Sequence, residues 1–144
     1  MDLCDRSAAE LSRMLKKKEV SSREITESVL GRIDEKESLI RAYITTTPEL
    51  AIKQADLADK RFRRGESLSP LDGIPIAVKD VLCTKGIKTT CGSAILKDYV
   101  PPYNATAVKG VMKSGAVLIG KTNMDEFAMG SSTENSAFGA TRNP

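Results

Sequence analysis

The sequence of 144 residues contains no histidine. Without an imidazole, neither a Ser-His-Asp triad nor a Cys-His pair can be assembled from these residues. A side chain that accepts a proton in a reaction would have to be a lysine, a carboxylate, a tyrosine or a cysteine. The absence therefore directs attention to lysines in unusual surroundings.

Long apolar runs are absent as well. The apolar runs are short, as at residues 116–119, whereas a helix that crosses a bilayer needs about 20 apolar residues. The N-terminus lacks the basic and then apolar layout of a secretory signal. These absences predict a cytoplasmic protein that has no membrane partner.

Cysteine is scarce, since Cys4, Cys83 and Cys91 are the three in the chain. Their number is odd and no C-x-x-C spacing occurs, which argues against a disulfide framework and against a zinc knuckle. We therefore expect small buried thiols and no metal site.

Charge is nearly balanced, with 22 basic and 19 acidic residues and a formal net charge of +3. Two basic clusters, residues 16–18 and 61–64, fall near the expected C-terminal ends of helices, where they complement the helix dipole. A nucleic-acid footprint is usually denser and broader than this. The share of hydrophobic residues is 40%, which is typical of one soluble globular domain or of part of one.

Helix signals dominate the first part of the chain. Residues 7–10 and 21–24 each have the Ser-x-x-Glu pattern of a capping box and precede apolar positions at helical spacing. A third helix is expected from Pro48, after a potential cap at Thr47, to Gly65. Its buried face would carry Ala51, Ala55, Ala58 and Phe62.

Strands and helices then alternate. Short β-branched or apolar runs predict strands at residues 43–46, 74–78 and 116–119, and Pro75 favours a sheet edge for the second of them. Helices are expected at residues 106–113 and from Asn123, as a cap, to about Gly130, with a loop over residues 84–103. The alternation predicts an α/β fold with a mostly parallel or mixed sheet flanked by helices.

Two regions follow from this reading. We assign residues 1–66 to an N-terminal helical segment. We assign residues 67–144 to the first strands and helices of an α/β core that is incomplete at its C-terminus. The few predicted strands fall short of the usual five or six in a sheet, so we expect a truncated domain.

Residues 115–122 fit the letters of a phosphate-binding P-loop, Gly-x-x-x-x-Gly-Lys-Thr. In such a loop the residues between the glycines turn backbone N–H groups toward a phosphate, after a strand and before a long helix. Here they are β-branched and apolar, and burying each of them in a sheet is worth about 1.5–3 kcal/mol. We therefore interpret the segment as a strand and reject a nucleotide site.

Residues 71–80 run an apolar strand directly into Lys79. A lysine that acts as a general base must be neutral, whereas an ordinary lysine with a pKa of about 10.4 is charged at pH 7. Burial among apolar neighbours such as Ile76 and Val78 would favour the neutral form, and Asp80 should point to the opposite face. Lys79 is therefore the candidate catalytic residue, with a solvated strand end as the alternative.

Residues 129–136 follow the last expected helix and are rich in small hydroxyl side chains. Such residues usually form turns. A dyad of Lys79 and Ser131 is conceivable, but no glycine-flanked nucleophile elbow surrounds Ser131. We interpret the segment as part of a pocket wall.

Residues 71–80, 92–93 and 100–106 carry a resemblance to a known family, because they resemble the amidase signature family. Residues 120–139 are more specific and resemble, within that family, the ammonia-supplying subunits of tRNA-dependent amidotransferases. The resemblance covers essentially the whole chain. It implies the N-terminal part of the amidase signature fold.

The family uses a Ser-cis-Ser-Lys triad, and Lys79 matches its lysine. The resemblance also places Met129, Gly130 and Ser131 near the substrate. It implies that the side-chain amide of glutamine is hydrolysed through an acyl-enzyme. The ammonia would pass to a partner subunit that converts Glu-tRNA(Gln) to Gln-tRNA(Gln), with aspartyl-tRNA as the substrate in some relatives.

The partners implied by the resemblance are the B and C subunits of a heterotrimer. Transfer RNA would be contacted indirectly, through the B subunit. ATP and magnesium are expected on the partner subunit, and no cofactor is expected in this chain.

The chain departs from the family in one respect that matters for catalysis. Both serines of the triad lie, in the family, after the Thr-Arg-Asn-Pro sequence of residues 141–144. A lysine without its nucleophile cannot form an acyl-enzyme, so we expect this portion to be inactive alone. The alternatives are a broad-specificity amidase and a catalytically inactive module that docks a partner.

Overall fold

A computed structural model describes residues 2–144, and these residues form two compact units. Unit 1 contains the chain up to Glu35, Thr47–Ile76 and Gly110–Ile119. Unit 2 contains Lys36–Thr46, Ala77–Lys109 and Gly120–Pro144. Each unit is therefore built from segments that are far apart in the sequence, and the division expected after residue 66 stays a prediction.

The predicted capping boxes begin the first two helices. These helices are α1, Ala8–Lys17, and α2, Ser22–Ile40. Ser7 Oγ accepts a hydrogen bond from the Glu10 N–H, and the Glu10 carboxylate accepts one from the Ser7 N–H at 2.9 Å. Ser21 and Glu24 repeat the arrangement at the start of α2, with 2.8 Å between the Ser21 nitrogen and the Glu24 carboxylate. Both boxes satisfy N–H groups that a helix start otherwise leaves unpaired.

Helix α3 spans Pro48–Arg64 and ends as the sequence indicates. Gly65 takes the left-handed conformation with φ of 75° and donates to carbonyls of the last turn, which is the usual C-terminal stop. The alanines at positions 51, 55 and 58 are fully buried, as expected from their spacing. Phe62 on the same face is partly buried.

The hydrophobic core of unit 1 joins α1, α2 and the residue before strand β2. Its buried members are Leu11, Leu15, Ile25 and Ile74, and partly buried apolar side chains pack against them. Burial of such a side chain contributes about 1.5–3 kcal/mol. This cluster therefore supplies much of the driving force that holds α1 and α2 in unit 1.

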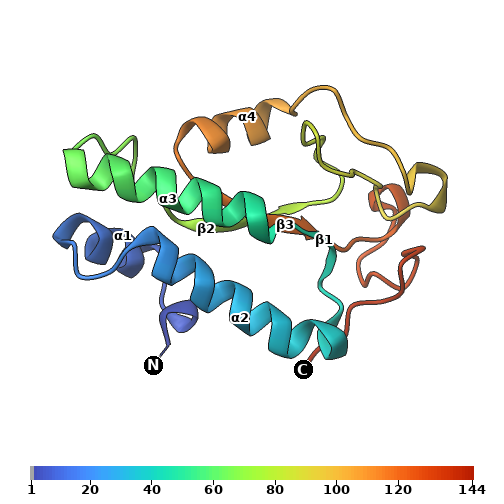
Figure 1. The fold of residues 1–144 in the computed structure, drawn as a ribbon. Helices are drawn as coiled ribbons and strands as arrows, with labels where there is room; N and C mark the ends of the chain where they lie inside the picture. The colour runs from blue at the N-terminus through green and yellow to red at the C-terminus, as the bar shows by residue number, and fades with distance from the viewer. Residues whose placement is uncertain (1) are drawn as a thin grey trace. The chain divides into compact units, whose positions relative to one another are not determined.

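The sheet is mixed and contains strands β1, Tyr43–Thr46, β2, Pro75–Lys79, and β3, Val117–Thr122, in the order β1-β3-β2 (Figure 1). Strands β1 and β3 are antiparallel. The N–H of Val117 donates to Ile74 and that of Asp80 donates to Thr122, so β2 and β3 run in the same direction. The predicted edge position of Pro75 is confirmed, because β2 is an outer strand.

Two further segments agree with the sequence pattern. Helix α4 covers Thr106–Lys113, and residues 84–103 contain no regular element except a short 3-10 turn at Ala94–Leu96. In the described part of the chain, no helix combines the length and the apolar composition that crossing a bilayer requires.

The helix expected from Asn123 to Gly130 is wrong, because only a 3-10 turn forms there, at Glu126–Ala128. Phe127 and Ala128 have φ of 51° and 63°, values that interrupt a right-handed helix. The Asn123 side-chain oxygen, expected to cap a helix, instead accepts from the Ser136 hydroxyl at 2.7 Å, and the NH2 group of the same side chain donates to the Gly139 carbonyl at 2.8 Å. Groups later in the chain therefore hold the side chain that would have started the helix.

Gly115 ends the turn between α4 and β3 in unit 1 with φ of 86°. A Cβ atom at this position would collide with the Asp72 carboxylate and lie 3.2 Å from the Arg61 guanidinium. Asp72 is 1% exposed and forms an ion pair with Arg61. The glycine is therefore required both by its backbone conformation and by the ion pair packed against it.

We expect Gly115→Ala to lower the free energy of unfolding by at least about 1–2 kcal/mol, the cost of a left-handed conformation for a residue with a Cβ. Gly110→Ala is the matched control, because Gly110 lies within α4 and no atom of the described residues lies within 4 Å of its Cβ position. That control should raise the free energy of unfolding by about 0.5–1 kcal/mol. Urea denaturation checks both values, and equal effects of the two changes would contradict this account of Gly115.

Candidate active site

Lys79 ends strand β2, and its side chain is exposed. The expected shielding of Lys79 by apolar neighbours is therefore wrong for the described residues. The cause is the strand pleat, which turns successive side chains to opposite faces. Val78 and Asp80 are buried, at 7% and 0% exposure, so Lys79 between them faces outward.

Asp80, the residue after Lys79, is held through its backbone N–H, its carbonyl and one carboxylate oxygen. Its N–H donates to the Thr122 carbonyl at 3.1 Å, and its own carbonyl accepts from the Cys91 N–H at 3.2 Å. Carboxylate oxygen Oδ2 accepts from the Thr90 N–H at 2.8 Å and from the Thr90 hydroxyl at 2.5 Å. These hydrogen bonds fix the backbone at Asp80, directly after Lys79.

The other carboxylate oxygen of Asp80 is paired with a buried lysine. Lys121 Nζ lies 3.1 Å from Asp80 Oδ1, and both side chains are fully buried. Among residues 2–144, no donor reaches Oδ1 in good hydrogen-bond geometry, so the ammonium charge is what compensates it. Nζ also donates to the Thr89 hydroxyl at 2.8 Å and approaches the Lys88 carbonyl at 3.5 Å.

Lys121 is the residue that the sequence interpretation missed. The expected strand stopped at Ile119, whereas β3 continues through Gly120 and Lys121 to Thr122. Burial lowers the pKa of Lys121, and the attraction of Asp80 opposes that shift. A signal was present, because a lysine inside a buried strand needs an acid on a neighbouring strand, and Asp80 directly follows β2.

The three residues expected near a substrate form an exposed loop in unit 2. Met129 is 80% exposed, and Gly130 and Ser131 are exposed as well. Among the described residues, no hydrogen bond joins Ser131 to Lys79. The chain therefore presents this loop as a surface, without a bond between Ser131 and Lys79, and the assignment of the loop to a pocket wall stays a prediction.

The Asp125 carboxylate organises this loop from inside. Its Oδ2 accepts from the backbone N–H groups of Ser132 and Thr133 at 3.0 and 2.9 Å. Its Oδ1 accepts from the backbone N–H and the side-chain amide of Asn135 at 3.0 and 3.2 Å. These donors hold the pKa of Asp125 below its usual range. A Cβ atom on Gly130 would collide with the same carboxylate, so the loop can wrap this closely because residue 130 is glycine.

A short backbone bridge connects Lys79 to this loop. The N–H of Cys91 donates to the Asp80 carbonyl, and the Cys91 carbonyl accepts from the Phe127 N–H at 2.8 Å. The neighbouring Gly92 carbonyl accepts from the Ala137 N–H, also at 2.8 Å. Lys79 and Met129–Ser131 therefore belong to one hydrogen-bonded assembly within unit 2.

The bridge leaves no room for a side chain at Gly92. A Cβ atom there would lie 2.6 Å from the Met124 carbonyl oxygen, and the backbone has φ of 68°. Cys91 has φ of 54° and is partly exposed. The expectation of buried thiols is wrong, because all three cysteines are partly exposed, although burial still raises the pKa of Cys91.

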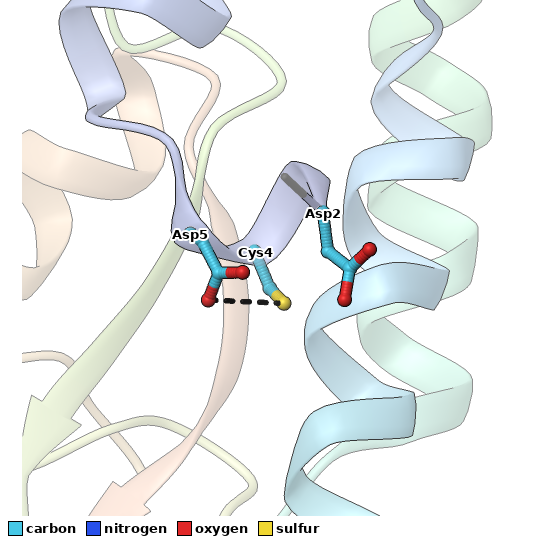
Figure 2. A group of neighbouring side chains, drawn as sticks. All are labelled: Asp2, Cys4 and Asp5. Carbon is cyan, nitrogen blue, oxygen red and sulfur yellow. Dashed lines mark hydrogen bonds between the residues drawn. The ribbon is translucent and has the colours of Figure 1, made fainter.

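A second group of chemically active side chains lies near the start of unit 1. Figure 2 shows Asp2, Cys4 and Asp5 with their ligand atoms turned toward one another, all within 4.8 Å. Arg32 lies 3.4 Å from the Asp2 carboxylate and 3.1 Å from that of Asp5. The guanidinium already compensates both acids, so their proximity requires no metal ion.

We expect Asp125→Asn to remove an acid-sensitive part of the stability. Because the pKa of Asp125 is lowered in the folded state, its contribution is complete above the unfolded value of about 3.9 and is lost as the pH falls through the folded value. The variant should therefore be less stable than the parent near neutral pH, and the difference should shrink below about pH 4.

Urea denaturation of both proteins between about pH 7 and pH 3 measures this difference. Asp98→Asn serves as the control, because Asp98 is exposed and pairs with Lys88 on the surface, where an ion pair contributes little. A difference between Asp125→Asn and the parent that stays constant down to about pH 3 would be incompatible with the proposed role of the carboxylate.

Comparison with known proteins identifies the family. Residues 24–144 match the family model for amidases. The A subunit of glutamyl-tRNA(Gln) amidotransferase from Dehalococcoides mccartyi (strain CBDB1) is 55% identical over 143 residues, which cover 99% of this chain and 29% of that protein. The protein of the same name from Moorella thermoacetica is 52% identical over 144 residues, covering 100% of this chain and 30% of that protein.

A solved structure of the same kind of protein is also similar. The crystal structure of the glutamyl-tRNA(Gln) amidotransferase A subunit from Thermotoga maritima gives a TM-score of 0.74 at 32% sequence identity, covering 99% of this chain and 28% of that chain. The present chain thus spans less than a third of the length of the relatives it matches. The family match extends over most of the sequence, including β2, the Asp125 loop and β3, and the chain belongs to the amidase family.

Proposed function

We propose that this chain is the lysine-bearing N-terminal portion of a glutamine amidohydrolase subunit in a tRNA-dependent amidotransferase that converts Glu-tRNA(Gln) to Gln-tRNA(Gln). The observation that carries the proposal is the position of Lys79. Its side chain is exposed, while the residue that follows it is buried, with hydrogen bonds at its backbone and at Oδ2 and an ion pair at Oδ1. An amine that is accessible and rigidly mounted suits a general base.

Lys79 would take the proton of a serine nucleophile. In the proposed reaction, a serine oxygen attacks the amide carbon of the glutamine side chain, and its proton passes through a bridging serine to the lysine amine. Ammonia leaves with a proton returned from the same relay, and water then hydrolyses the acyl-enzyme ester to glutamate. Both serines would come from sequence that lies beyond these 144 residues in the relatives.

The exposure of Lys79 fits a site in which the serines come from a different part of a longer protein. The relatives are more than three times as long as the matched region, so further elements are available to cover the outward face of β2. Covering that face would remove water from around the amine and so favour its neutral form. Met129, Gly130 and Ser131 lie on the exposed loop around Asp125, which further elements could also cover. We therefore assign these three residues to one wall of the glutamine pocket.

The partners in this proposal are the B and C subunits of a heterotrimer. ATP and magnesium would act on the partner subunit, where the carboxylate of Glu-tRNA(Gln) is activated, and tRNA would be held by the B subunit. The complex is expected in the cytoplasm. The names of relatives that are 52–55% identical to this chain support a complex that acts on glutamyl-tRNA(Gln).

We predict that Lys79→Ala in the full-length subunit, assembled with its partners, lowers kcat for ammonia release from glutamine by at least about 100-fold, the usual minimum for loss of a general base. The fold should survive, because the side chain is exposed. Lys85→Ala is the matched control, since Lys85 is an exposed lysine on the same segment of unit 2, and its kcat should equal that of the parent.

The choice of amide separates the remaining alternatives. Ammonia release from glutamine far above that from asparagine and from simple aliphatic amides supports the amidotransferase assignment. Equal release from all of them would instead indicate a broad-specificity amidase, and no release from any would indicate a docking module. Near-normal turnover of glutamine by Lys79→Ala would refute the role of the lysine.

A further inference from the structure

The buried pair of Lys121 and Asp80 takes no part in the proposed proton relay, and its presence needs another explanation. Both side chains are 0% exposed, and Lys121 has the largest fully buried side chain of the chain's described part. Removing two charges from water is costly, and apolar residues of similar volume often serve equally well for stability alone. A buried pair with this cost is consistent with a role in fixing one particular geometry.

The geometry that the pair fixes is the end of β2. Lys121 lies on β3 and Asp80 lies immediately after β2, so the ion pair joins the two neighbouring strands at their C-terminal ends. Thr89 and Thr90 complete the attachment, because the Thr89 hydroxyl accepts from Lys121 and Thr90 donates twice to Asp80. Lys79 is the residue directly before this attachment point.

Because β2 is fixed at Asp80, the Lys79 side chain can point to only one face of the sheet. With Asp80 held on the buried face, the pleat turns the neighbouring side chain to the exposed face. A reacting group displaced by about 1 Å can lose about 100-fold in rate. The orientation of β2 at residue 80 can therefore determine the rate even though neither buried side chain would touch a substrate.

We propose that Lys121 is a positioning residue, whose ion pair with Asp80 fixes the end of β2 and thereby the direction of the Lys79 side chain. This inference rests on the proposed function of Lys79 as the general base. Lys121 acts through Asp80 and donates no proton to the reaction.

The chain offers a matched control in the ion pair of Arg61 and Asp72. Asp72 is also buried, and its Oδ2 accepts a backbone N–H bond, from Leu68 at 2.9 Å, as Asp80 Oδ2 does from Thr90 at 2.8 Å. This second pair belongs to unit 1. Removing either cation leaves a buried carboxylate that keeps one backbone donor, so the structural damage should be similar in kind.

The test compares Lys121→Met with Arg61→Met in the full-length subunit with its partners. We expect both variants to melt at a lower temperature than the parent. Lys121→Met should also lower kcat for glutamine hydrolysis by about 100-fold per folded enzyme, with little change in KM, whereas Arg61→Met should retain the parental kcat. A parental kcat in folded Lys121→Met would overturn the proposal.

Hydrogen exchange supplies a readout that does not depend on activity. The Asp80 N–H donates to Thr122 and the Cys91 N–H donates to Asp80, so both amides report on the end of β2. Their exchange should be faster in Lys121→Met and unchanged in Arg61→Met. Unchanged exchange at both amides in Lys121→Met would count against the positioning role, whatever the kinetics show.

Two further variants keep the outcomes distinguishable. If Lys121→Met does not fold, Asp80→Asn combined with Lys121→Met removes both charges and avoids an unpaired buried ion. This double variant should fold and still have a reduced kcat, and a parental kcat would overturn the proposal. Full activity of Lys79→Ala would refute the proposed function itself, whatever the Lys121 variants show.

Discussion

The buried charge pair of Asp80 and Lys121 is the constraint on which the candidate site depends. Either charge alone in the interior of unit 2 would be strongly destabilising, so the pair favours an arrangement in which the C-terminal ends of β2 and β3 lie side by side. Once Asp80 is inside, Lys79 must be outside. Cys91 then attaches the same point to the loop around Asp125. The ion pair of Asp80 and Lys121 thus helps to fix the positions of both Lys79 and the loop that carries Met129–Ser131.

Local patterns made much of the fold predictable. The edge position of β2 was predictable because Pro75 lacks a backbone N–H. The capping boxes at Ser7 and Ser21 and the left-handed stop at Gly65 depend on interactions within a few residues. The helix expected after Asn123 failed for the opposite reason. The side chains of Asn123 and Asp125 bond to backbone groups seven to 16 positions away, and no local pattern reveals such a partner.

The site could be predicted in part. The missing histidine and the apolar strand before Lys79, together with the family resemblance, point to this lysine. Lys79 is exposed and not shielded as expected, because the neighbouring Asp80 occupies the buried face. A buried carboxylate directly after β2 and a buried lysine near the end of β3 are each unfavourable alone, and considering them together would have paired Asp80 with Lys121. The described residues contain one side of the proposed site, as expected of a chain that spans 29–30% of its relatives.

In the full-length protein, we expect the exposed amine of Lys79 to meet a serine supplied by the rest of a longer amidase. A crystal structure of that protein with a covalent glutamine analogue would show whether it does. Lys79 Nζ should lie within hydrogen-bond distance, about 2.6–3.2 Å, of a serine hydroxyl that leads to the acylated serine. A structure in which Lys79 points into solvent with no serine in reach of its amine would refute its role as the general base.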